Sequence, residues 1–183
     1  MESDNSIWIE GLAAKLRADK ALAEKAIGQL GDEELHWKPS ANDNSIYTIV
    51  RHLHGNMLSR FTGFPDQDGE KSWRDREGEF AEASGTRQEC LRLYEEGFHA
   101  MEQALAPLSD SDLQKTVTIR GEPHTVFQAL VRHLSHHAYH VGQIVYIAKM
   151  LKAGDWKSLS IPRGASVKFD HQKQEGISPE KSS

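Results

Sequence analysis

The chain has 183 residues, 38% of them hydrophobic, which is enough for one domain with a buried core. Its 22 basic and 27 acidic side chains give a net charge of −5, and no Lys and Arg cluster marks a surface for nucleic acid or membrane, so neither partner is expected. The one cysteine, Cys90, excludes an intramolecular disulfide and a cysteine-based zinc site. The N-terminus is acidic and no long apolar run follows it, so we expect a cytoplasmic protein.

Two helices are predicted in the first third of the chain. Apolar residues recur at three- and four-residue steps over residues 5–30 and again over residues 44–62. Gly31 is expected to end the first helix, because glycine readily adopts the conformation that follows a helix. Asn44 or Ser45 is expected to cap the second.

A polar and charged stretch without helical periodicity follows, from Gly63 to Gly85. Connections of this length in a compact domain are usually crossovers or functional covers. We expect a solvated crossover that is held down by its aromatic residues, Trp73 and Phe80. The alternative is a lid that contacts substrate, in which Arg74 or Arg76 would hold an anionic group.

Capping patterns mark the starts of two further helices. Thr86 with Glu89 opens a helix predicted over residues 86–107. Thr125 with Gln128 opens a last helix predicted over residues 125–153. Between them, residues 116–119 alternate in the manner of a strand and residues 121–123 turn the chain, which predicts a short β-hairpin before the last helix.

The number of helices and the length of the link together predict the fold class. Four helices with a long connection between the second and the third indicate an all-α four-helix bundle whose middle pair runs parallel, because the connection must then travel the length of the bundle. Residues 1–170 are expected to form this single domain. Residues 171–183 are expected to be a disordered tail.

Four of the ten histidines lie in the last predicted helix: His133, His136, His137 and His140. At about 100° per residue they form one stripe that continues into apolar residues, so they occupy a face suited to burial. A buried unpaired polar group costs roughly 1–3 kcal/mol, and a shared metal ion would satisfy several imidazoles at once. Spacing alone does not choose between His133 with His137 and His136 with His140. His52, beside the apolar stripe of the second helix, is the best third ligand, and hydrogen-bonded core histidines are the alternative.

The residues His136-x-x-Tyr139-His140-x-Gly142-Gln143-Ile144, preceded by a helix that carries His52, resemble the DinB-like superfamily, also called YfiT-like. The similarity points to an uncharacterised subgroup of it. Three further segments carry this part of the resemblance, which covers most of the chain: residues 55–61, 68–76 and 156–162.

The resemblance implies a four-helix bundle, usually a homodimer, that binds one divalent metal ion through His52, His136 and His140, with zinc or nickel expected. It places His133 and His137 outside the ligand set. Tyr139 is a candidate for the pocket rim, and a purely structural role is the alternative. Relatives include thiol-dependent transferases and isomerases that use bacillithiol or mycothiol, and others without assigned activity.

These expectations define the function to be tested. The first expected function is that of a metal-dependent enzyme. It would act on a small-molecule substrate as a thiol-dependent S-transferase, with a low-molecular-weight thiol as second cofactor. The alternatives are a metal-dependent hydrolase and a non-catalytic dimeric metal-binding module. Activity should fall as the pH drops toward the reference histidine pKa of about 6.5, because protons compete with the metal for imidazole nitrogens.

Overall fold

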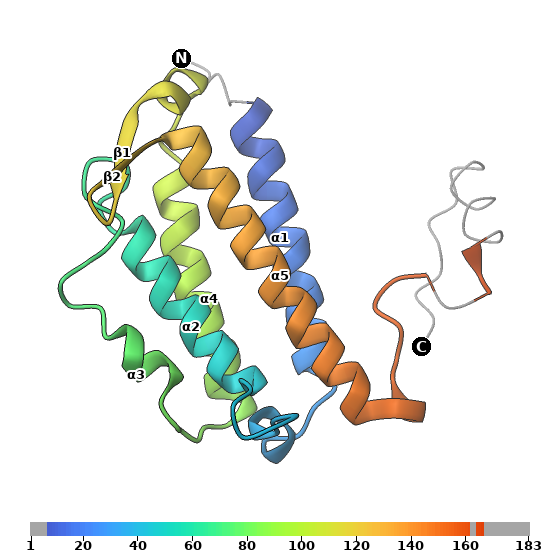
Figure 1. Ribbon diagram of the computed structural model, residues 1–183. Coiled ribbons are helices and arrows are strands. Elements are labelled where there is room, and N and C mark those ends of the chain that lie inside the picture. Colours follow the sequence, from blue (N-terminus) through green and yellow to red (C-terminus); the bar gives the residue numbers. More distant parts are fainter. Residues whose placement is uncertain (1–6, 162–163, 167–183) are drawn as a thin grey trace.

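The computed structural model describes residues 7–161 and 164–166, and four long helices dominate it (Figure 1). These are α1 (Ile7–Ile27), α2 (Ile46–Phe61), α4 (Arg87–Leu105) and α5 (Val126–Lys152). Short elements join them: α3 (Arg76–Phe80), strands β1 (Thr116–Ile119) and β2 (Glu122–Thr125), and 3-10 helices over Glu33–His36, Asp110–Gln114 and Ala153–Asp155. The predicted all-α bundle with a short hairpin before the last helix is confirmed. The start of the first helix at residue 5 and the tail over residues 171–183 lie outside the described residues.

The helix directions follow the prediction made from the length of the link. In Figure 1, α1 and α5 run one way and α2 and α4 run the other. The register agrees, because a side chain added at Gly85 would meet Tyr47, and one added at Gly97 would meet His54, so the residue numbers rise together along α2 and α4. The middle pair is therefore parallel, and the link runs the length of the bundle.

The core lies between two helix pairs. Its largest fully buried apolar side chains come from all four helices and include Leu16, Ile27, Leu53, Phe98 and Ile144. Helix α2 packs chiefly on α4, and α1 on α5, while α2 and α5 contact each other less. Because α2 and α5 make fewer contacts with each other, there is room for a pocket between them.

Helix starts are fixed by local hydrogen bonds that the sequence predicted. Ser45, rather than Asn44, caps α2 by accepting a hydrogen bond from the Thr48 backbone N–H. The capping box of Thr125 and Gln128 is complete at the start of α5. Helix α1 ends at Ile27, earlier than the predicted Leu30.

The link is attached to the β-hairpin through Asp68. The Asp68 carboxylate accepts hydrogen bonds from the backbone N–H groups of Arg120, at 3.0 Å, and Gly121, at 2.8 Å. Both turn residues have positive φ, 58° and 75°, as a two-residue hairpin turn requires. For Arg120 this conformation is strained, and the contacts of Asp68 hold it in place.

The aromatic residues of the link do not all anchor it as expected. Trp73 is 56% exposed, so it is not a buried anchor. Phe80 instead packs on the His52 ring, with the ring centroids 4.8 Å apart. The short helix α3 was not predicted, because five residues are too few to show a helical period. None of the described helices combines the length and hydropathy that a membrane crossing would need.

Candidate metal centre and its pocket

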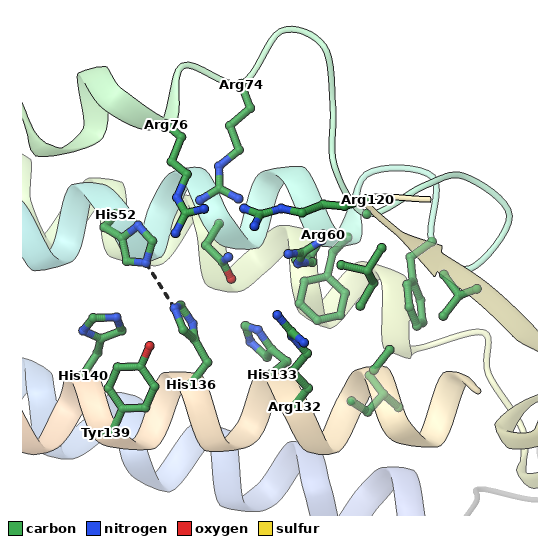
Figure 2. A pocket seen from close by; sticks show the side chains of 18 of the residues that line it. His52, Arg60, Arg74, Arg76, Arg120, Arg132, His133, His136, Tyr139 and His140 are labelled. Carbon is green, nitrogen blue, oxygen red and sulfur yellow. Dashed lines mark hydrogen bonds between the residues drawn. The ribbon is translucent and has the colours of Figure 1, made fainter. Parts of the chain in front are cut away.

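Three histidines from two helices converge beside the pocket (Figure 2). Helix α2 contributes His52, and α5 contributes His136 and His140, which share one helix face because they lie four residues apart. One ring nitrogen from each lies within 4.8 Å of the others. The Nε2 atoms of His52 and His136 are 3.1 Å apart. The structure thus brings together the three residues that the family resemblance implied.

Hydrogen bonds at the far side of two rings set the tautomers. His52 Nδ1–H donates to Glu79 Oε2 at 2.9 Å, and His140 Nδ1–H donates to Gln143 Oε1 at 2.8 Å. Because a carboxylate or an amide oxygen only accepts, the proton of each neutral ring belongs on Nδ1. The Nε2 lone pairs of both rings are therefore free for a cation.

Two of the converging rings, His136 and His140, are neutral at ordinary pH. Burial, and then the charge of neighbouring histidines, lowers the pKa of His136 to about 3. Burial lowers the pKa of His140 to about 4, although its hydrogen bond with Gln143 opposes this. Neutral imidazole is the form that binds metals.

A single divalent ion fits this donor set. A proton on His136 Nε2 can satisfy the 3.1 Å contact with His52, but it cannot serve three converging nitrogens. His52, His136 and His140 would hold such an ion through one ring nitrogen each, once the side chains move closer than their present separations of up to 4.8 Å. Three imidazoles leave at least one coordination position open.

Glu79 of α3 holds the His52 ring and is itself held by Arg74. Arg74 Nε and Nη2 donate to the two Glu79 carboxylate oxygens at 2.7 Å and 2.9 Å, and the Arg74 side chain is only 2% exposed. Burial alone would raise the pKa of Glu79, but the hydrogen bonds from His52 and Arg74 outweigh it and lower the pKa. The carboxylate therefore stays charged and fixes the ring.

Sequence reasoning missed Glu79, because it lies 27 residues from His52 and no spacing rule connects them. Gln143 was within reach of the sequence. It follows His140 by three residues, so the two share a helix face.

The other two histidines of α5 are directed elsewhere. His137 Nε2 hydrogen-bonds to the Tyr94 hydroxyl of α4 at 2.7 Å inside the core. His133 lies edge-on to the Phe61 ring and lines the pocket. The choice that spacing left open is thus decided by packing. His54, two residues after His52, is half-buried and 3.6 Å from Glu96 of α4.

A pocket of about 360 Å³ opens beside the three histidines. Its walls come from α2, α5, β1 and the link, which contributes Phe64, Gly69, Arg74, Arg76 and Phe80. The expectation that the link is only a solvated crossover is therefore wrong, since the link forms one wall of the site. Tyr139 lines the pocket and is 55% exposed, so of its two alternatives the structure shows the one at the rim.

No sequence pattern predicted the three further arginines at this site. Arg60, Arg120 and Arg132 line the pocket from α2, the hairpin turn and α5 (Figure 2). An arginine on the polar arc of an amphipathic helix is ordinarily solvated, so periodicity does not reveal it.

The chain was compared with known families, curated proteins and solved structures. Residues 4–165 match the model of the family described as "Protein of unknown function (DUF1572)". A crystal structure of a DinB-like protein from Bacillus cereus ATCC 10987 is similar, with a TM-score of 0.58 and 18% identity, over 82% of this chain and 94% of that chain. At this identity the likeness shows the fold alone. The comparison with curated proteins finds no match. The chain therefore belongs to the DUF1572 family and has a DinB-like fold.

Proposed function

We propose that the protein is a metal-dependent enzyme that binds one divalent ion, zinc or nickel, through His52, His136 and His140. The observation that carries this proposal is the convergence of three imidazoles at a pocket of about 360 Å³. Structural zinc sites are usually closed by four protein ligands, whereas catalytic sites keep a position open for water or substrate. A pocket at the open side favours the catalytic use.

The reaction we propose is the transfer of a low-molecular-weight thiol to an electrophilic small molecule. When bound, the ion would lower the pKa of the thiol and favour its thiolate. The chain supplies the geometry. Glu79 and Gln143 hold two ligand rings, Phe80 covers the His52 ring, and the Tyr139 hydroxyl at the rim is available to a polar group of the substrate.

The metal ligands are tested by metal analysis of untagged protein after chelation and reconstitution. We expect one equivalent of zinc or nickel in the wild type and loss of the ion in the His52→Ala, His136→Ala and His140→Ala variants. His133→Ala is the matched control, since it removes a pocket histidine outside the set. Full metal content in His52→Ala together with loss in His133→Ala would contradict the assignment.

The reaction is tested with the metal-loaded protein and a panel of thiols and electrophiles. Conjugate formation should be faster with the wild type than with His136→Ala. If it is no faster with any thiol, the transferase proposal fails, and ester and amide substrates then test the hydrolase alternative. If neither reaction is observed, the remaining alternative is a non-catalytic metal-binding module.

We also propose that the protein is a homodimer, with α1 and α5 at the interface. Large apolar side chains are exposed near the starts of both helices: Ile7 and Trp8 at 76% and 66%, and Phe127 and Val131 at 45% and 41%. Exposed apolar surface of this kind is typical of an association site. Light scattering should give twice the chain mass for the wild type and the chain mass for Trp8→Glu, and a monomeric wild type would reject the proposal.

A further inference from the structure

The pocket beside the three histidines is strongly basic. Five arginines line it: Arg60, Arg74, Arg76, Arg120 and Arg132 (Figure 2). No lysine, aspartate or glutamate of the described chain is among the lining residues. This charge contrasts with the net charge of −5 on the whole chain, so the arginines are concentrated here.

Two nearby carboxylates neutralise only part of the charge. Glu79 pairs with Arg74, as described above. Glu70 lies 3.1 Å from Arg120 and 3.8 Å from both Arg60 and Arg74, so one carboxylate is shared among three guanidinium groups. The pocket therefore keeps an excess of positive charge.

Two of the pocket arginines carry no ion pair with any residue that the structure describes. These are Arg76, from the link, and Arg132, from α5. Both guanidinium groups are on exposed residues at the pocket wall, where they are free to meet an incoming anion.

Two residues that line the pocket carry buried polar atoms without partners in the part of the chain that the structure describes. Arg60 Nη1 is buried and has no hydrogen-bond partner within the described chain, although the guanidinium is a strong donor. Both ring nitrogens of His133, a residue only 5% exposed, likewise have no partner there. Native proteins rarely leave such groups unsatisfied, so an explanation is required. Arg60 of α2 and His133 of α5 line one pocket, and a polar ligand that these side chains turned to meet would satisfy both.

We infer that the pocket binds a small organic acid, whose carboxylate or phosphate is held by Arg60, Arg132 and His133. The planar guanidinium matches either acid group with paired hydrogen bonds. Phe61, Phe64 and Leu130 line the same pocket and provide an apolar surface for the rest of the molecule. A pocket of about 360 Å³ is at the small end of the range for ligand sites.

The position of the acid group constrains the substrate of the proposed metal-dependent reaction, and this step rests on that proposed function. Arg132 and His133 precede His136 by four and three residues on α5. At a rise of 1.5 Å per residue, they lie about 4.5–6 Å from His136 along the helix axis. Figure 2 shows the same order, with Arg60, Arg132 and His133 to one side of the three histidines. The substrate class is therefore an acid whose reacting atom lies a few bonds from its acid group.

The inference is tested by calorimetric titration with hexanoate, hexyl phosphate and hexan-1-ol. Each is titrated into chelated protein and into zinc-loaded protein. We expect both acids to bind at least about tenfold more tightly than the alcohol, and Arg132→Gln to weaken acid binding by about tenfold or more. Arg17→Gln is the matched control, because Arg17 is an exposed arginine on α1, outside the pocket. Whichever of the two acids binds more tightly shows whether the site prefers a carboxylate or a phosphate.

Arg60→Lys adds a second variant that keeps the charge but removes the planar fork, and it should also weaken acid binding. Equal binding of the acids and the alcohol would overturn the inference, as would unchanged acid binding in Arg132→Gln. If zinc does not load but the acids bind through the arginines, the acid site stands and the proposed metal function fails. If zinc loads and neither acid binds either form, the acid site is rejected and the metal proposal stands.

Discussion

The hydrogen bond between Glu79 and His52 predicts that a residue outside the ligand set controls metal affinity. In Glu79→Gln the side chain keeps its shape but loses its charge. One of its two terminal atoms becomes a donor, so the side chain can no longer accept all three hydrogen bonds, from His52 Nδ1, Arg74 Nη2 and Arg74 Nε. If the amide nitrogen faces His52, the ring loses its acceptor, and if the amide oxygen faces His52, the ring keeps the bond but loses the charge that strengthens it.

The expected magnitude follows from the burial of these groups. Loss of a partner that orients a metal-binding histidine typically weakens metal binding by about 10–100-fold, or about 1.4–2.7 kcal/mol. The Arg74 side chain is only 2% exposed, so it would be left without a full counter-charge. Breaking a buried ion pair costs about 3–5 kcal/mol, and because glutamine keeps one acceptor we expect the free energy of unfolding to fall by about 3 kcal/mol.

Two measurements separate these effects. Competition with a chromogenic chelator gives zinc affinity in buffer where the variant is still folded, and urea unfolding of the metal-free protein gives stability. Glu77→Gln is the control, because Glu77 is an exposed residue of the same short helix. Zinc affinity within about twofold of wild type would refute the orienting role, and an unchanged free energy of unfolding would refute the buried ion pair.

Three further predictions follow from other contacts. In the metal-free protein, burial lowers the pKa of His136 to about 3 and of His140 to about 4. As the pH falls, the unfolded chain, with histidine pKa values near 6.5, therefore takes up protons first, and urea unfolding should show stability decreasing from about pH 6.5 down to about pH 3. In His136→Gln, stability should fall less steeply over this pH range. The folded site should also keep its metal below about pH 6.5, where the sequence alone predicted a loss. Tyr94→Phe removes the buried partner of His137 and should lower the free energy of unfolding by about 1–3 kcal/mol with metal content unchanged; loss of metal would contradict the core role of His137. Asp68→Ala frees the backbone N–H groups of the hairpin turn, so the melting temperature should fall and hexanoate binding should weaken as Arg120 moves, and unchanged values for both would argue against this anchor.

Local sequence patterns were sufficient for the helices and their order. Apolar periodicity, the capping residues Ser45, Thr86 and Thr125, and the length of the link predicted four helices and a parallel middle pair, all of which the structure contains. These features depend on residues within a few positions of one another, or on chain length, and the sequence displays both directly. The inward direction of His52 was also predictable, because it lies beside a continuous apolar stripe.

Only the tertiary structure decided which histidines meet. The pairs at 133 and 137 and at 136 and 140 have the same spacing, so the choice depends on how α5 is rotated against its neighbours. Packing places His137 against Tyr94 of α4 and His136 against His52 of α2, contacts that span 43 and 84 residues. The link that the sequence presented as polar brings Glu79 to His52. Such contacts arise from the packing of whole elements, so the periodicity of a single helix does not predict them.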